Sequence, residues 1–479
     1  MHPSFSGSWS RIVCALVTLA ALVAGCRPLT PLTRLKPEVS TPTAYTLYEA
    51  GEAYPDRWWR VFDAPELERL IATALTDDFS IRAAWSRLRR AKAEAMQTGA
   101  GTAPELSLDT GFSAQRRRLA ERTTAGETYA LGLAAAYELD WWGRIRSEQE
   151  AAQLEVQAAA ADIHTAAMTV AAEVATNWIQ LITQQAHRRL LQAQIETSET
   201  YLELIQLRFQ KGMVSALDVY QQQQVVEQLQ SRLPLVNETE AKLHHRMALL
   251  LGRTPGAPIS VSRDTLPELP PQPAAGIPAD LLARRPDVRA AGSRLRAADW
   301  QEAAARANRL PSLTLSGTAG FSSARVDRLL EDWLMRLAAN LTTPLYDGKR
   351  RRAAVDRRRA MVDEALWTYR QTVYRAIGEV QDALASEAAR QEHIATLKGE
   401  LETSRVALEQ ALLRYRKGLN TYLPVLTQIT LVQRLEQDLI SRQAELLENR
   451  IALYRALGGA WTDRLPDGGS DPPNAEREQ

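Results

Sequence analysis

The chain has 479 residues, of which 24% are charged and 45% hydrophobic, and its formal net charge at pH 7 is +1. This balance argues against a nucleic-acid-binding domain, since no basic region or basic stripe with interleaved aromatic residues stands out. Length alone would suggest about three ordinary domains, but long helical runs and an internal repeat overrule that expectation.

The N-terminus is typical of a signal peptide spanning residues 1–25. Arg11 precedes an apolar run over residues 12–24, which has signal-peptide length and is too short to span a bilayer. The run ends in the letters VAGC at residues 23–26, which resemble a bacterial lipobox; a plain signal beside a chance cysteine is the alternative. We therefore expect lipid attachment, such as palmitate, at Cys26. The neighbouring Arg27 is not the Asp that commonly retains lipoproteins in the inner membrane, which favours the outer membrane.

Residues 26–57 are rich in Pro and Thr and have no periodicity, which predicts an extended, lipidated tether. A single lipid group binds a membrane only marginally, so stable anchoring requires a second membrane element. From residue 66 to about 98 the apolar positions follow a helical period, and Pro65 suits the entry to one continuous helix.

Four segments alternate with a period of two and are predicted strands. They lie at residues 104–114, 127–140, 311–321 and 333–346, with a polar, basic loop at 115–126. Tyr129 and Tyr137 share one apolar face about 26 Å apart, at ~3.3 Å per residue. This matches the apolar band, about 25 Å tall between aromatic girdles, of an outer-membrane barrel; half of a soluble sandwich is the alternative. Four strands cannot close a barrel, and lipid does not tolerate an open edge, so we expect a barrel shared between chains.

Residues 144–211 contain no Pro or Gly, which predicts one helix about 100 Å long at 1.5 Å per residue. Apolar residues recur along it at steps of three and four, and a second run after residue 349 has the same pattern, which is typical of coiled-coil packing. We expect shorter helices at 215–251 and 421–457, with Pro234 kinking or interrupting the first.

Sequence copies about 206 positions apart indicate a duplication. RFQKG at residues 208–212 recurs as RYRKG at 414–418, and IRAAWSRLR at 81–89 recurs as VRAAGSRLR at 288–296. Each KG is a predicted helix-turn-helix tip, with Gly212 and Gly418 as left-handed caps. The expected order is repeat 1 at 58–252, a Pro-rich connector at 253–279, repeat 2 at 280–461 and a disordered tail at 462–479.

No catalytic, cofactor or metal motif was found. The six histidines are scattered, and the adjacent His244 and His245 point about 100° apart on a helix, so they cannot share one metal. There is no glycine-rich phosphate loop after a strand and no GxSxG motif. We interpret the Asp and Glu pairs on the helices as parts of solvent-exposed helix faces. We expect no enzyme activity, no cofactor and no metal.

Three motifs carry a resemblance to a known family: WWRVFDAPELERLIATAL at residues 58–75, LARRPDVRAAGSRLRAA at 282–298, and LDWWGR at 139–144 with its counterpart PLYDGK at 344–349. The chain resembles the TolC-like outer-membrane efflux factors, in the lipoprotein (OprM/NodT-type) branch. The resemblance implies a mostly α fold with a β membrane portion, in which a homotrimer forms a shared 12-stranded β-barrel and a periplasmic α-helical barrel. It also implies a periplasmic adaptor and an inner-membrane RND-type pump as partners, with this protein as the passive exit duct for drugs or other small molecules.

The resemblance further implies a constriction at the turn of the second half. Tyr415 would sit at the turn, Leu423 would form an apolar ring, and Thr427 takes a place usually held by an acidic residue. Thr427 and the adjacent Pro424 depart from the family pattern, so an acidic, cation-filtering ring is not expected. The nearest carboxylate in the first-half copy is Asp218.

The sequence is compatible with two alternatives. One is a type I secretion duct of the same family, which lipidation disfavours because secretion ducts are generally not lipoproteins. The other is a coiled-coil scaffold of the cell envelope, which would need no strand with a lipid-facing side.

Overall fold

The computed structural model describes residues 28–31, 41–46, 55–120, 122–459 and 461–462. Cys26 and the signal peptide lie outside this described part, as does most of the tail. Within these ranges, none of the helices is both long and apolar enough to cross a membrane. The chain divides into two compact units. The described parts of the first fall within residues 1–38, 87–159 and 290–370, and those of the second within 39–86, 160–289 and 371–479.

The elements follow one another in an order that repeats once. The first half contains η1 (Trp58–Phe62), α2 (Pro65–Asp77), α3 (Phe79–Ala100), β1 (Glu105–Leu119), β2 (Arg122–Leu139), α4 (Arg144–Gln210) and α5 (Ala216–Leu250). The second half contains η2 (Pro278–Asp280), α6 (Leu281–Arg284), α7 (Pro286–Ala307), β3 (Ser312–Ser323), η3 (Val326–Arg328), β4 (Trp333–Thr342), α8 (Arg350–Arg416) and α9 (Leu423–Leu457). The predicted long helices are confirmed, because α4 and α8 have 67 residues each and α5 and α9 have 35 each.

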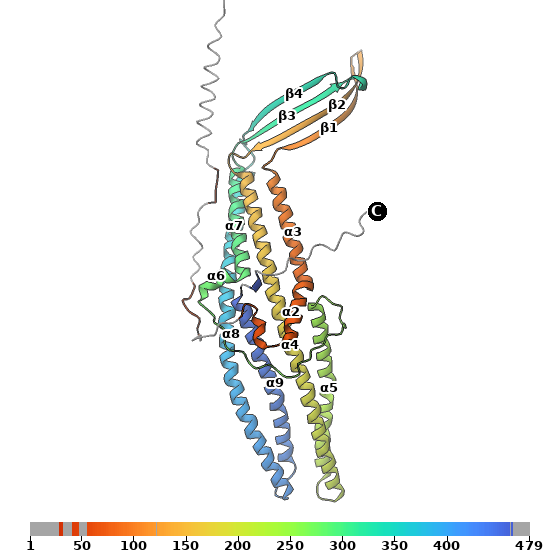
Figure 1. Cartoon of the computed structure of the whole chain (residues 1–479), viewed down its shortest axis with the longest axis vertical. Coiled ribbons are helices and arrows are strands. Elements are labelled where there is room, and N and C mark those ends of the chain that lie inside the picture. Colours follow the sequence, from red (N-terminus) through yellow and green to blue (C-terminus); the bar gives the residue numbers. More distant parts are fainter. Residues whose placement is uncertain (1–27, 32–40, 47–54, 121, 460, 463–479) are drawn as a thin grey trace, which may run out of the picture. The chain divides into compact units, whose positions relative to one another are not determined.

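The first unit holds an antiparallel sheet with the strand order β1-β2-β3-β4 (Figure 1). The stretch expected as a basic loop at 115–126 is instead mostly strand, because Gln115 pairs with Gly126 and the register runs without a break to Leu119 and Arg122. The polar composition of this stretch therefore does not prevent strand pairing. Both faces of the two strands are exposed here, so neither face requires apolar side chains at alternate positions.

Each sheet-to-helix junction is fixed by an aspartate. The carboxylate of Asp140 accepts hydrogen bonds from the amides of Ile145 (3.1 Å) and Arg146 (2.9 Å) at the start of α4. The carboxylate of Asp347 accepts one from the amide of Arg351 (3.1 Å) at the start of α8. An acceptor at a helix N-terminus satisfies amides that have no partner within the helix. This explains the recurrence of the motif as LDWWGR and PLYDGK.

In the second unit, the helix expected from residue 66 to about 98 is divided at Asp78. Asp78 has an extended backbone (ψ 133°), and its carboxylate accepts hydrogen bonds from the amides of Ser80 (2.8 Å) and Ile81 (3.2 Å). The prediction of one continuous helix was wrong because these bonds end α2 and begin α3, and an aspartate within a helical period does not reveal that choice.

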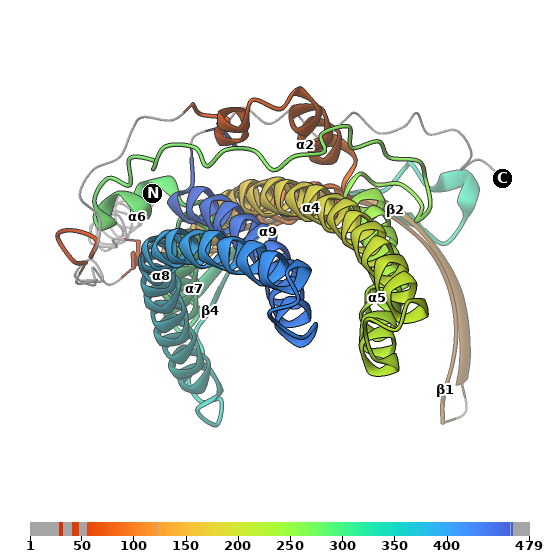
Figure 2. The same ribbon diagram turned by 90° about the horizontal axis from the view of Figure 1, so that it is seen from below.

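The second unit also contains two helical hairpins. Figures 1 and 2 show α4 beside α5 and α8 beside α9. Pro234 lies within α5 and does not interrupt it. The residue is on the exposed side of the helix, so the carbonyl that loses its amide partner can accept a hydrogen bond from water.

An aromatic cluster forms the core of the second unit. The ring of Trp58 stacks on Tyr454 at 5.4 Å, and the ring of Trp59 meets Trp461 edge-on at 4.9 Å. The indole of Trp178 on α4 donates a hydrogen bond to Glu66 on α2 (2.7 Å). These contacts join the segment from Trp58 to Glu66 to α9 and α4, one helix of each long hairpin.

The Pro-rich connector is fastened by a buried ion pair, which we call the connector clasp: Arg450 of α9 with Glu387 of α8. The guanidinium donates to both carboxylate oxygens, at 2.8 and 2.7 Å, and also to the carbonyls of Pro270 and Pro271. The two side chains are only 1% and 5% exposed. Burying two charges is unfavourable unless all their hydrogen bonds are made, and here one guanidinium joins α8, α9 and the connector.

Candidate functional site

The sheet of the first unit has one apolar face. The unbroken register places Leu108 beside Leu133, Leu133 beside Ala319, and Ala319 beside Met335. The neighbouring rows are built in the same way: Leu106, Ala135, Gly317 and Leu337 form one, and Thr110, Leu131, Phe321 and Trp333 another. The alternation predicted for each strand is confirmed, and the four apolar faces lie on the same side of the sheet.

The opposite face of the same sheet carries polar and small side chains, with the exposed Leu334 of β4 as an exception. Its exposed or half-exposed members come from all four strands: Ser107, Asp109, Glu138, Thr314, Ser316, Thr318, Arg336 and Asn340. Most large apolar side chains of the sheet remain exposed on the apolar face, including Leu108, Leu133 and Leu337. An exposed apolar sheet face backed by a polar one is the pattern of a strand set with lipid on one side and water on the other.

Aromatic side chains mark both ends of the apolar face. At one end the rings of Phe112 and Tyr129 are 5.0 Å apart, and Phe321 pairs with Trp333 one row away. Tyr137 lies eight residues from Tyr129 along β2, or about 26 Å at ~3.3 Å per residue. Aromatic residues favour the two interfaces of a bilayer, so the spacing of these rings suits an apolar band between two interfaces.

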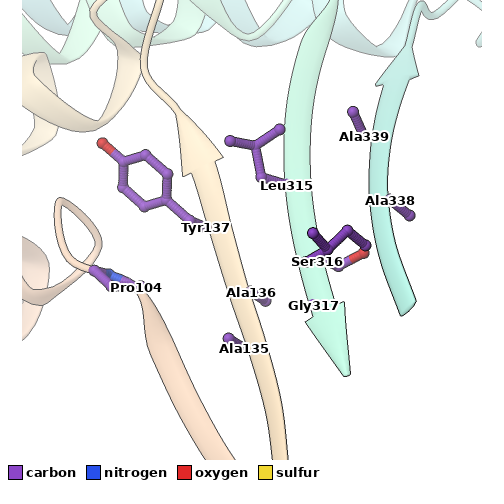
Figure 3. A pocket seen from close by; sticks show the side chains of 10 residues that line it. Pro104, Ala135, Ala136, Tyr137, Leu315, Ser316, Gly317, Ala338 and Ala339 are labelled. Carbon is purple, nitrogen blue, oxygen red and sulfur yellow. The ribbon is translucent and has the colours of Figure 1, made fainter. Parts of the chain in front are cut away.

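Around Tyr137 the sheet carries a hollow of about 520 Å³. Figure 3 shows the side chains of Tyr137 and Leu315 next to each other on adjacent strands, with Pro104 beside them. The residues that line the hollow are mainly apolar, and none of them is charged. The described residues also contain no group of three or more His, Cys, Asp or Glu side chains able to hold a metal ion.

In the second unit, both helix tips are closed by the same backbone motif. Gly212 has φ +68° and Gly418 has φ +71°. The amides of Gly212 and Met213 donate to the carbonyls of Phe209 and Arg208, both at 2.8 Å, and the second tip repeats this arrangement at 3.0 Å. This is the Schellman arrangement, which needs a left-handed residue after the helix and so favours glycine.

The two helices that leave the tips begin differently. Asp218 and Ser215 form a capping box at the start of α5, in which the carboxylate accepts from the Ser215 amide (2.9 Å) and hydroxyl (2.8 Å). At the start of α9, Tyr422 occupies the capping position, but its side chain makes no capping hydrogen bond to the helix, and Pro424 lies in the first turn. The carboxylate of Asp218 is therefore already committed to its own helix.

The second tip is held by a tyrosine pair that the sequence did not indicate. Tyr415 is 8% exposed, its ring lies 5.4 Å from that of Tyr422, and the guanidinium of Arg208 lies 4.7 Å from the Tyr415 ring. The Tyr422 hydroxyl donates to the side-chain oxygen of Gln222 (2.7 Å). Burial raises the pKa of Tyr422 above its usual range, so this hydroxyl stays protonated and able to donate.

Leu423 and Thr427 lie together on the exposed side of the first turns of α9. Leu423 is 54% exposed, and the Thr427 hydroxyl donates to the Leu423 carbonyl (2.9 Å). Leu217, the first-half counterpart of Leu423, is also exposed. The structure thus separates the predicted constriction residues into an exposed pair, Leu423 and Thr427, and the buried Tyr415.

A ladder of polar side chains joins α4 to α9 between the tips and the clasp. Gln194 donates to the carbonyl of Gln433 (3.2 Å), Gln433 donates to the Ser198 hydroxyl (3.1 Å), and Gln437 donates to Gln194 (2.8 Å). Buried amides of this kind specify one register between two helices, because a shifted register would leave them unpaired. Glutamines within a helical period gave no sign of this role in the sequence.

Comparison with known proteins agrees with this geometry. A family profile described as "Outer membrane efflux protein" matches residues 70–253 and 277–459, which is more than half of the chain. The chain belongs to the outer membrane efflux protein family. The two matched stretches contain both tip motifs and all four strands of the sheet.

Several members of the family are similar over nearly their whole length. The chain is 33% identical over 474 residues to the pyoverdine export outer membrane protein OpmQ of Pseudomonas putida, covering 95% of this chain and 99% of that protein. It is 30% identical over 473 residues to the toluene efflux pump outer membrane protein TtgF of Pseudomonas putida, covering 93% and 96%.

Solved structures give the same family and fold. The outer-membrane channel OprN matches with a TM-score of 0.82 at 28% identity, covering 91% of this chain and 98% of that one. The outer membrane protein VceC of Vibrio cholerae matches with a TM-score of 0.79 at 26% identity, covering 85% and 100%. The duplicated fold of long helices and two strands per half is therefore the fold of outer-membrane efflux channels.

Proposed function

We propose that this outer membrane efflux protein is the passive exit duct of a tripartite, RND-type system that exports small molecules. The observation that carries the proposal is the sheet with one exposed apolar face, aromatic residues at both ends of that face and a polar face behind it. A duct needs a lipid-facing wall and a water-facing lumen, and it needs no catalytic group.

The working form in this proposal is a homotrimer. In the described chain β1 and β4 each pair with one neighbour only, so both edges of the sheet are open. Open edges are not tolerated in lipid, and a barrel needs about eight strands or more, so chains must pair edge to edge. Three copies give a 12-stranded barrel. The test is the oligomeric mass of the purified protein together with its conductance in a planar bilayer; a non-conducting monomer would contradict the proposal.

The partners in this proposal are a periplasmic adaptor and an inner-membrane pump. The relative TtgF is named as an outer membrane protein of an efflux pump, and α4 and α8 are each about 100 Å long at 1.5 Å per residue, which suits a rod crossing the periplasm. Relatives named for pyoverdine export and toluene efflux favour small-molecule cargo over the protein cargo of a type I secretion duct.

We place the constriction of the duct at the tip of α8 and α9. The support is the exposure of Leu423 and Thr427 beside a turn that the Tyr415–Tyr422 pair holds in place. Three copies of Leu423 would form an apolar ring, and apolar constrictions close pores by excluding water. In this arrangement Tyr415 affects the constriction only through packing. The Asp218 carboxylate lies on the neighbouring hairpin, where it caps α5.

Leu423→Ser is expected to make the duct leaky. Replacing the apolar ring with hydroxyl groups allows water to enter the constriction, so the single-channel conductance should rise and cells lacking the pump should become more sensitive to vancomycin. Leu217→Ser, the same change at the first-half counterpart, is the matched control and should leave both values unchanged. A lower melting temperature with unaltered conductance would instead mean that Leu423 only packs against its own helix partner.

Thr427→Asp is expected to raise cation preference with little effect on opening. The exposed charges directly beside the two turns are basic, at Lys211, Arg414, Arg416 and Lys417, and Thr427 itself carries no charge. A ring of added carboxylates would attract cations. The reversal potential in a salt gradient measures this preference, and Thr427→Asn is the uncharged control. An identical shift with Asn would show that charge is not the cause.

Cys26→Ser is expected to remove lipid without releasing the protein. Wild-type mature protein should exceed its polypeptide mass by the mass of acyl chains, and the variant should lose this excess in intact-mass measurement. The variant should stay largely in the outer membrane, because a shared barrel is a stronger anchor than one lipid group. Complete recovery from the soluble periplasm would count against the barrel.

A further inference from the structure

The β1–β2 hairpin continues beyond the four-stranded part of the sheet. Pairing between β2 and β3 ends at Tyr129 and Ser323, whereas β1 and β2 remain paired as far as Leu119 and Arg122. The projecting part starts just past the aromatic pair Phe112 and Tyr129. It is therefore a two-stranded ribbon that leaves the apolar band at one membrane interface.

The projecting ribbon carries three consecutive exposed arginines: Arg116, Arg117 and Arg118. Since the register has no bulge, alternate residues of β1 keep to the same face throughout. Arg116 and Arg118 therefore continue the apolar face of Leu108 and Phe112. Arg117 belongs to the opposite, polar face.

The height of these side chains suits a lipid headgroup layer. Arg116 follows Phe112 by four residues and Arg118 follows it by six, about 13 Å and about 20 Å along the strand at ~3.3 Å per residue. A barrel strand tilted by ~40° converts these distances to about 10 Å and about 15 Å above the aromatic level. Headgroup layers extend about 5–8 Å beyond the hydrocarbon on each side, and a long arginine side chain can bend back toward the interface.

Among the described residues of the hairpin, the neighbours of the two arginines leave their charge available. Their cross-strand partners are small, with Ala125 opposite Arg116 and Thr123 opposite Arg118. Glu127 is the acidic residue of β2 on this face, and its carboxylate accepts a hydrogen bond from the Tyr129 hydroxyl (3.4 Å). A basic pair above an apolar band complements phosphate groups and would be poorly placed against hydrocarbon.

We propose that Arg116 and Arg118 bind the phosphate groups of lipid headgroups in the leaflet around this end of the barrel. This inference rests on the proposed function, because it needs the apolar face to contact lipid. A guanidinium matches a phosphate with two parallel hydrogen bonds, and basic side chains at an anionic lipid surface strengthen binding cumulatively. The two arginines would hold the projecting ribbon against a phosphorylated glycolipid.

The test measures lipid retained by the full-length protein in detergent micelles. Native mass spectrometry is carried out with diphosphoryl lipid A as the probe and monophosphoryl lipid A as the comparison. The double variant Arg116→Gln/Arg118→Gln should bind diphosphoryl lipid A about thirtyfold more weakly, as expected for two basic residues at an anionic lipid surface. Wild type should prefer the diphosphoryl form, and millimolar inorganic phosphate should not displace the lipid.

Arg117→Gln is the matched control, because it removes the same charge from the same strand on the other face. It should leave lipid binding unchanged. Equal loss in Arg117→Gln and the double variant would overturn the proposal, since the hairpin would then attract lipid without regard to face. Unchanged binding in the double variant would overturn it as well. Conductance in a planar bilayer is measured in parallel, so a double variant that conducts normally but loses lipid separates this inference from the duct itself.

Discussion

Leu133→Arg is expected to destabilise the membrane-inserted sheet by about 2–4 kcal/mol, the cost of an arginine on the lipid face of a barrel near the bilayer midplane. Leu133 occupies a row midway between Tyr129 and Tyr137, beside Leu108 and Ala319. At that depth the guanidinium has neither water nor a headgroup within easy reach. Urea unfolding of the protein in lipid vesicles measures the loss.

The matched control for this change is Ala134→Arg, on the next residue of the same strand. Ala134 belongs to the polar face with Ser107 and Thr318, so its arginine should point into water and cost far less. The less disruptive Ala134→Ser should be nearly neutral. Equal tolerance of arginine at both positions would mean that β2 is not embedded in lipid, whereas a larger loss at Ala134 would mean that the two faces are reversed.

Arg450→Met is expected to cost about 3–5 kcal/mol, since it leaves the Glu387 carboxylate buried without its partner. It also removes the donor that holds the Pro270 and Pro271 carbonyls. The denaturation midpoint of the detergent-solubilised protein should fall, and the connector should be cut earlier in limited proteolysis. The double variant Arg450→Met/Glu387→Leu should recover much of the loss, because no charge is then left buried.

Arg189→Met provides the comparison for the connector clasp. Arg189 also contacts the connector, through an ion pair with Asp264 at 2.7 Å, but both of these side chains are substantially exposed. An exposed pair contributes about 0–1 kcal/mol, so this variant should hardly change the midpoint. Similar losses for Arg189→Met and Arg450→Met would show that burial does not set the strength of the clasp.

The features that depend on local sequence were predictable. The absence of Pro and Gly over residues 144–211 predicted α4 almost to the residue, because nothing in that stretch breaks a helix. The alternation along β2 predicted which of its residues share a face, since the period of a strand is two. The KG letters predicted glycines with positive φ at Gly212 and Gly418, as the structure has them.

The features that depend on distant partners were not predictable. Asp78 could either continue one helix or cap the start of a second one, and the helical period of the apolar residues is the same in both cases. Tyr415 was expected at the turn, but its burial depends on Tyr422 and on Arg208, which is 207 positions away in the sequence. Arg450 and Glu387 are 63 positions apart, and neither stands out among the many charged residues of the helices.

The open edges of the sheet also affect the chain before it reaches its membrane. A strand with free amides and carbonyls on one side can pair with almost any other exposed strand, and here both edges belong to a sheet whose apolar face is uncovered. A fully folded monomer in water would therefore be prone to aggregation. Sheet closure, assembly and membrane insertion must accordingly be tightly coupled, and any delay should expose the chain to chaperones and proteases of the compartment it crosses.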